Sequence, residues 1–141
     1  MKVWFVDDLL ENRNTWLNSF PERVVSENQF ESFASVSGLL ERCSSGDSPD
    51  ILFVDFFIDG SYGIDVIKFF QKSNRQSPLI IAHSSMDEAN DAMLRAGANL
   101  KMAKVKGAAV TSSIARDIQD SEALRRLLES RTQVRSQNQN L

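Results

Sequence analysis

Residues 51–60 read ILFVDFFIDG, in which four large apolar residues run without alternation into one carboxylate, Asp55. An unbroken apolar run between Pro49-Asp50 and Gly60 indicates a strand buried on both faces, which is typical of a parallel sheet covered by helices. Ligands of such sheets bind outside the carboxyl ends of the strands, where Asp55 is expected to lie. An Asp at this place is equally typical of a turn that caps the next helix.

Apolar strands and amphipathic helices alternate along the rest of the chain. Further strands are expected at residues 3–6, 29–33, 79–82 and 99–104. Helices are expected at about residues 9–20, 36–43, 64–72 and 110–128, and from about Ala89 to Ala96, just before Gly97. This alternation predicts an α/β fold, a doubly wound five-stranded parallel sheet with helices on both faces.

Composition limits the class of protein. With 141 residues, of which 42% are hydrophobic, the chain is long enough for one domain with a real core, expected at residues 1–130. The polar residues 131–141 are expected to form a disordered tail. The net charge of −3 argues against a nucleic-acid partner, and the single cysteine, Cys43, excludes an internal disulfide or a Cys-based zinc cluster.

The hydrophobic segments are short. No apolar stretch approaches the roughly 18 residues of a membrane span, and the apolar start of the chain is too short for a signal peptide. We therefore expect a cytoplasmic protein with no membrane partner.

Polar residues follow several of the expected strands. Asp7 and Asp8 follow the first strand, Asp55 follows the third, Ser84 comes just after the fourth, and Lys104 ends the fifth. Because the carboxyl ends of parallel strands meet at one edge of the sheet, these residues are expected to form an acidic cluster with one cation and one hydroxyl. Carboxylates that lie close together repel one another or recruit a cation, and hard oxygen ligands suit Mg²⁺.

In this combination the chain resembles the receiver domains of two-component response regulators, including the chemotaxis-type single-domain receivers. The family has an acidic pair, an acceptor Asp, a Thr or Ser and a Lys after strands one, three, four and five, and here these places hold Asp7-Asp8, Asp55, Ser84 and Lys104. Gly63 lies at the spacing from the acceptor where the family usually has a glycine. The resemblance covers nearly everything up to about Leu128 and implies the flavodoxin-like strand order 2-1-3-4-5.

The resemblance implies that Asp55 accepts a phosphoryl group from a sensor histidine kinase or a histidine phosphotransfer protein, in a phosphorelay that uses Mg²⁺. Asp8, Asp55 and the backbone carbonyl of Phe57 would bind the metal ion, and Asp7 would act mainly through water. Lys104 and Ser84 would contact the phosphoryl oxygens. The domain would then transfer and release the phosphoryl group itself, without being a turnover hydrolase, and would signal through a surface that binds a partner.

Some positions depart from the family pattern. Val105 replaces the proline that usually follows the lysine, and Lys101 stands where many receivers have a Tyr or Phe whose rotation reports phosphorylation. The segment between the fourth strand and Gly97 is slightly short, so that His83 competes with Ser84 for the hydroxyl position. We favour Ser84, because an imidazole offers no hydroxyl group.

Other interpretations stay open. The departures at Lys101 and Val105 leave room for a pseudo-receiver, an interaction module that is never phosphorylated. A phosphatase of the haloacid-dehalogenase type is disfavoured, because Phe57 stands where such enzymes have their second Asp. The end of the last expected helix is interpreted either as a surface that presents Leu124, Leu127 and Leu128 to a partner, such as a second copy of the chain, or as a solvated end.

Overall fold

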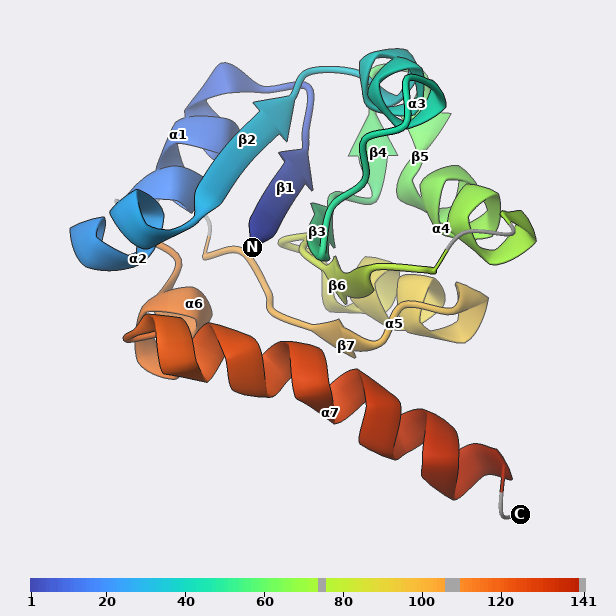
Figure 1. The fold of residues 1–141 in the computed structure, drawn as a ribbon. Helices are drawn as coiled ribbons and strands as arrows, with labels where there is room; N and C mark the ends of the chain where they lie inside the picture. Colours follow the sequence, from blue (N-terminus) through green and yellow to red (C-terminus); the bar gives the residue numbers. More distant parts are fainter. Residues whose placement is uncertain (74–75, 106–109, 140–141) are drawn as a thin grey trace.

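The computed structural model describes residues 1–73, 76–105 and 110–139, and only the backbone of residues 131–139. Its centre is a five-stranded sheet in which every neighbouring pair of strands is parallel (Figure 1). The order is β2 (Gln29–Phe33), β1 (Lys2–Val6), β3 (Ile51–Val54), β6 (Leu79–Ala82) and β7 (Leu100–Lys101). Numbered within the sheet this is the order 2-1-3-4-5, so the predicted doubly wound α/β fold is confirmed.

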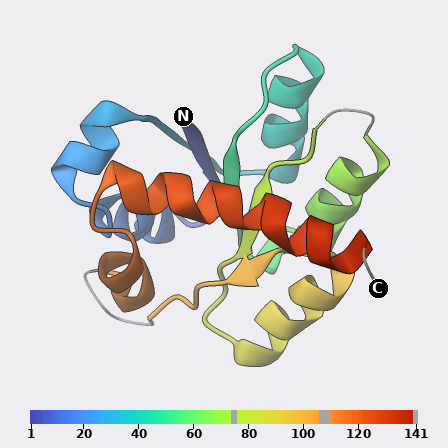
Figure 2. The ribbon, with the colours of Figure 1, turned by 60° about the horizontal axis from the view of Figure 1, so that its bottom comes forward.

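Helices cover both faces of the sheet (Figures 1 and 2). One face packs against α3 (Val36–Ser44), α4 (Gly63–Lys72) and α5 (Asp87–Ala96). The other face packs against α1 (Leu10–Asn18), α2 (Glu22–Glu27), α6 (Ser112–Asp117) and α7 (Ser121–Gln139). Among the described residues, no helix combines the length and the apolar composition that crossing a bilayer requires.

Burial on both faces explains why the apolar run of β3 does not alternate. Leu52 and Val54 pack with the helices of one face, and Ile51 and Phe53 pack with those of the other. All four side chains are fully buried, and burial of such a side chain stabilises a fold by roughly 1.5–3 kcal/mol. The carboxyl end of β3, where Asp55 follows, is therefore held in place by core packing on both sides.

The chain between β1 and β2 differs from the prediction of one helix over residues 9–20. α1 ends at Asn18, and Pro21 precedes a second, short helix, α2. Of the apolar residues at helical spacing in this range, Trp16 and Phe20 are buried, whereas Leu9 and Leu17 are exposed. A proline is well tolerated at the start of a helix, so Pro21 closes α1 and opens α2 at once.

The last expected helix, at residues 110–128, is wrong as a single element. The chain forms α6 and α7, with a break between Asp117 and Ser121. Asp120 marks where α7 begins, because its carboxylate accepts a hydrogen bond from the backbone N–H of Ala123 (2.7 Å) and so caps the new helix.

The burial of α7 bears on the interpretation that its leucines are presented to a partner. Figure 2 shows α7 crossing the strands, with its start tied to the α2 end of the molecule by a hydrogen bond from Asn28 to Ser121 (3.3 Å). Leu124 is fully buried in the core, and Leu127 and Leu128 pack partly buried against the same cluster. These leucines therefore cover the sheet rather than forming an exposed surface for a second copy. The division at residue 130 stays a prediction, although the backbone of α7 is helical to Gln139.

Candidate functional site

Three neighbouring strands deliver polar residues to one edge of the sheet. Val6 pairs with Val54, and Val54 pairs with Ala82, so the residues that follow, Asp7, Asp55 and His83, lie in register across β1, β3 and β6. The backbone hydrogen bonds between the strands extend to these residues. The N–H of Asp55 donates to the carbonyl of Val6 (3.3 Å), and the N–H of His83 donates to the carbonyl of Val54 (2.8 Å).

Three carboxylates meet at this edge. Asp7, Asp8 and Asp55 each offer an oxygen within 4.8 Å of the others. Asp7 is fully buried, whereas Asp8 and Asp55 are half-buried and so remain open to a ligand from solvent. A set of carboxylate oxygens without nitrogen or sulfur has the chemistry that Mg²⁺ prefers, so the three residues could hold such an ion.

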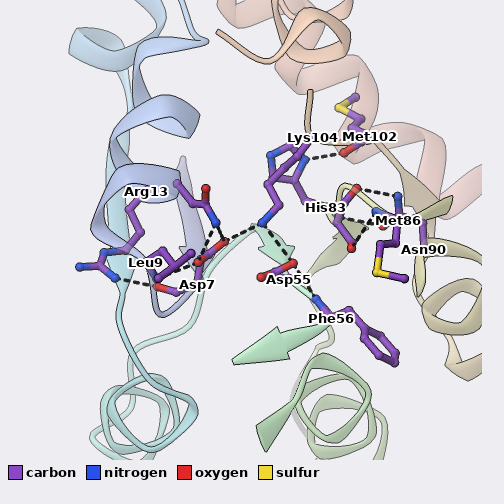
Figure 3. A network of polar contacts seen from close by, with 12 residues as sticks. Asp7, Leu9, Arg13, Asp55, Phe56, His83, Met86, Asn90, Met102 and Lys104 are labelled. Carbon is purple, nitrogen blue, oxygen red and sulfur yellow. Dashed lines mark hydrogen bonds and ion pairs between the residues drawn. The ribbon is translucent and has the colours of Figure 1, made fainter. Parts of the chain in front are cut away.

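Lys104 joins the acidic cluster from the loop after β7. Its Nζ lies 2.8 Å from Asp7 Oδ2 and 3.2 Å from Asp55 Oδ1, and its side chain is only 14% exposed (Figure 3). The ammonium group thus bridges two carboxylates that would otherwise repel each other at close range. Lys104 is therefore part of the cluster and not a solvated charge on the surface.

Asp55 has an unusual acidity for a carboxyl group. Burial raises the pKa of Asp55 to about 6, the nearby Asp7 carboxylate acts in the same direction, and Lys104 opposes both. Oδ1 of Asp55 also accepts the backbone N–H of Phe56 (2.9 Å), which holds the side chain toward the cluster. A carboxylate with a raised pKa is more basic, and therefore a better oxygen nucleophile, than one that is fully hydrated.

Asp7 is fixed by contacts that the sequence did not reveal. Its Oδ1 accepts the backbone N–H of Leu9 (2.9 Å), and the side-chain amide of Asn12 donates to both carboxylate oxygens (3.3 and 3.1 Å). Arg13 donates from Nη1 to the backbone carbonyl of Asp7 (2.7 Å). Because Lys104 also bonds to Asp7, the carboxylate of Asp7 has few lone pairs left to bind a metal ion directly. This fits the expectation that Asp7 contacts a metal ion through water.

A small hairpin follows Asp55. β4 (Phe57–Ile58) and β5 (Ser61–Tyr62) pair antiparallel around Asp59 and Gly60, which both have positive φ angles, 44° and 81°. Asp-Gly is the sequence that favours such mirror-image turns. Phe57, the first residue of the hairpin, comes two residues after Asp55, and its ring is exposed.

Gly63 closes the hairpin onto the site. Its N–H donates to the carbonyl of Phe56 (2.7 Å), and a Cβ on Gly63 would lie only 2.1 Å from the backbone oxygen of Asp55. Only a residue without a side chain allows this approach. The glycine expected at this spacing therefore has a steric reason in this chain.

His83 and Ser84 occupy different surroundings. His83, the residue in register with Asp55, is fully buried, its ring packs on Phe5 and Phe53, and its Nδ1 contacts the carbonyl of Met102. Burial lowers the pKa of His83 to about 4, so the ring is neutral and Nδ1 must carry the proton it donates. Ser84 lies one residue further along and is also buried. Its role as the hydroxyl residue stays a prediction.

The loop that carries Ser84 is held by a second residue that sequence reasoning missed. Ser84 Oγ accepts the backbone N–H of Met86 (3.2 Å), and the side chain of Asn90 bonds to both the N–H and the carbonyl of Ser84 (2.8 and 3.0 Å). Asn12 and Asn90 both lie on helices, and neither stands in a pattern that marks it in the sequence.

Solved structures resemble this chain closely in fold. A putative response regulator from Chloroflexus aurantiacus is 20% identical, with a TM-score of 0.63, over 91% of this chain and 97% of that chain. The chemotaxis response regulator CheY4 of Vibrio cholerae is 17% identical, with a TM-score of 0.63, over 89% and 97%. The response regulator TrrA from Thermotoga maritima, solved in complex with Mg²⁺ and BeF, is 19% identical, with a TM-score of 0.59, over 75% and 88%.

No protein-family model matches the sequence, and no curated protein matches it. The comparison therefore rests on structural similarity. At sequence identities this low, the similarity establishes the fold alone: the chain has the fold of a response-regulator receiver domain.

Proposed function

We propose that this chain is a phosphoacceptor domain of a two-component phosphorelay, with Asp55 as the acceptor. The observation that carries the proposal is the bridge that Lys104 makes between Asp7 and Asp55, inside a cluster of three carboxylates. A purely structural ion pair would not need a third carboxylate, Asp8, at the same open edge of the sheet.

The reaction is a transfer of a phosphoryl group from a histidine of the donor to Asp55. One carboxylate oxygen of Asp55 attacks phosphorus, and a P–O bond forms while the P–N bond to the donor imidazole breaks. The bonding electron pair stays on the imidazole nitrogen, which is protonated from solvent. Lys104 is free to turn from the Asp55 oxygen to a phosphoryl oxygen, and Asp7 keeps its own contacts from Leu9 and Asn12 meanwhile.

The metal ion would be held by Asp8, Asp55 and the backbone carbonyl of Phe57. When bound, Mg²⁺ would supply electrostatic stabilisation of the charge on the phosphoryl oxygens. Lys104 supplies the same kind of stabilisation from the chain itself, and Ser84 is the candidate donor of a hydroxyl hydrogen bond.

The surroundings of the site favour a protein as phosphodonor, namely a sensor histidine kinase or a histidine phosphotransfer protein. Most of the large apolar side chains that are exposed in the described ranges follow the carboxyl ends of strands: Leu9, Leu10, Phe57, Tyr62, Met86 and Val105. Exposed apolar groups that gather around a polar centre are typical of a surface that a protein covers.

The proposal predicts that Asp55 carries the label when the protein is incubated with phosphoramidate and Mg²⁺. Intact mass spectrometry should show one phosphoryl group on the wild type, none on Asp55→Asn, and strongly reduced labelling of Asp8→Asn because that variant loses a metal ligand. Asp87→Asn, which removes a surface carboxylate outside the cluster, is the matched control and should be labelled normally. An unlabelled wild type would favour the alternative of a pseudo-receiver.

A further inference from the structure

Asn90 makes an unusual pair of hydrogen bonds from inside α5. Its side chain is fully buried, Oδ1 accepts the backbone N–H of Ser84 (2.8 Å), and Nδ2 donates to the backbone carbonyl of the same residue (3.0 Å) (Figure 3). An amide that satisfies both backbone groups of one residue fixes its position and its orientation, as a neighbouring strand would.

We call the two hydrogen bonds from Asn90 to the backbone of Ser84 the clamp. A further hydrogen bond connects Ser84 to Lys104. The carbonyl of Ser84, which Asn90 holds, also accepts the backbone N–H of Lys104 (3.1 Å). The hydroxyl of Ser84 meanwhile accepts the N–H of Met86, so the whole turn after β6 is bonded. Asn90 thus holds the backbone of Ser84 directly and that of Lys104 through the Ser84 carbonyl, and both residues are candidates to contact a phosphoryl group.

The carboxylates of the metal-binding side contact the side-chain ammonium of Lys104, but their other supports are independent of Asn90. Asp7 is held by Leu9 and Asn12, and Asp55 by the N–H of Phe56. Asn90 makes no hydrogen bond with any of these residues among the contacts of the described part of the chain. A change at Asn90 should therefore disturb the phosphoryl contacts and spare the metal ligands.

We propose that Asn90 is a positioning residue for phosphoryl transfer, which acts through Ser84 and Lys104 and not through the metal ligands. The proposal rests on the proposed function of Asp55. Its physical basis is that a shift of a contacting group by about 1 Å can lower a reaction rate by about 100-fold.

Two variants separate the halves of the clamp. Asn90→Ala removes both bonds, whereas Asn90→Asp keeps an acceptor for the N–H of Ser84 and sets a carboxylate oxygen against its carbonyl. Asn99→Ala is the matched control. The side chain of Asn99 also accepts a backbone N–H, that of Ile80 in β6 (2.7 Å), but it does so away from the site. Circular dichroism selects variants that fold, and Asn90→Asp, which is nearly isosteric, serves if Asn90→Ala does not.

The measurements are the Mg²⁺ affinity by calorimetry and the labelling rate with phosphoramidate at saturating Mg²⁺. The expected result is an unchanged Mg²⁺ affinity with a labelling rate about 10- to 100-fold below that of Asn99→Ala. Equal rates for the Asn90 variants and Asn99→Ala would overturn the role of Asn90 alone, as would a parallel loss of Mg²⁺ affinity. A wild type that takes no label would overturn the proposed function and this inference together.

Discussion

At Asp55, burial and a neighbouring cation act in opposite directions on one carboxyl group. Burial together with Asp7 prevails over Lys104, which leaves the pKa of Asp55 raised to about 6. The group is therefore ionised at neutral pH but takes up a proton in mildly acidic solution. A proton on Asp55 blocks both proposed roles, because neither a metal ion nor phosphorus can use an oxygen whose lone pair is engaged.

Mg²⁺ affinity should consequently depend on pH in a range where ordinary carboxylates do not titrate. With the pKa of Asp55 at about 6, the dissociation constant should rise roughly tenfold between about pH 7.5 and about pH 5, because Mg²⁺ must displace a proton. Calorimetric titrations across this range measure the effect. The residual affinity of Asp55→Asn should have no midpoint near pH 6, and a wild-type affinity that is constant down to pH 5 would contradict the assignment.

Some residues of the site could be predicted from the sequence, and others could not. Asp7 and Asp55 could be predicted because each follows an apolar strand, and parallel strands bring their carboxyl ends to one edge. Lys104 was predicted to end a strand at residues 99–104, but β7 covers only Leu100–Lys101, so Lys104 reaches the site from the loop that follows. Asn12 and Asn90 could not, because each reaches the site from a helix through contacts that depend on how that helix packs. His83 stands in register with Asp55, but only the strand pairing reveals this.

Among the secondary-structure elements, the hairpin after Asp55 bears most directly on the site. It begins two residues after Asp55 and ends just before Gly63, whose Cα lies against the backbone of Asp55. The sequence contains the turn-forming pair Asp59-Gly60, but the pairing of β4 with β5 was not predicted. Two-residue strands are too short for a periodic signal, so only the turn residues mark them.

Gly63→Ala should damage both stability and the site. The new Cβ would lie 2.1 Å from the Asp55 carbonyl and 2.7 Å from Val54 Cγ1, so the backbone must shift. Overpacking of this kind costs about 1–3 kcal/mol of unfolding free energy, or more where backbone must move. Chemical denaturation and the phosphoramidate labelling rate measure the two effects.

Gly38→Ala is the control for this substitution. A Cβ at Gly38, in α3, meets only the side-chain oxygen of Ser35 (3.1 Å), which caps the helix by accepting the N–H of Gly38 and would have to give by only a few tenths of an ångström. Alanine is favoured over glycine in a helix by roughly 1 kcal/mol. Gly38→Ala should therefore be neutral or stabilising, and a Gly63→Ala variant as stable and as reactive as Gly38→Ala would refute the steric role of Gly63.

The C-terminal helices illustrate why an element boundary can be missed. Ile114 and Leu124 are both apolar and both buried, so they were compatible with one long amphipathic helix. The signal for the break was Asp120, a residue type that caps helices, three positions before Ala123. Because α7 begins as a separate helix, Leu124 packs into the core and is not presented to a partner.

At the scale of the whole molecule, the face formed by α5 and β7 lacks an aromatic residue at Lys101. Instead, Nζ of Lys101 contacts Asp87 Oδ1 (3.0 Å) and Asp91 Oδ1 (2.8 Å) on α5, and the side chain is 41% exposed. Surface ion pairs of this kind contribute about 0–1 kcal/mol each. Burial of the Lys101 ammonium in place of a ring would cost several kcal/mol, so Lys101 does not provide the movement that a ring would.

Phosphorylation should therefore change the structure mainly at the rim of the site. Amide chemical shifts with Mg²⁺, with and without beryllofluoride, should differ most at Ser84, Met86 and Lys104, and little at Lys101 or along α6. A ligand shifts an equilibrium only through its differential affinity for two states, and Lys101 provides no ring that could link the rim to this face. Shift changes at Lys101 as large as those at Ser84 would contradict this. Gly107, where we expect backbone movement, lies outside the described residues.

The proposal that Asp55 is the phosphoacceptor can be tested by locating the phosphoryl group on the chain. After labelling with phosphoramidate and Mg²⁺, borohydride reduction converts an aspartyl phosphate to homoserine, which peptide mass spectrometry locates. If Asp55 is the phosphoacceptor, homoserine should be found at position 55 alone. Homoserine at Asp7 or Asp8, or a labelled protein with none at position 55, would contradict it.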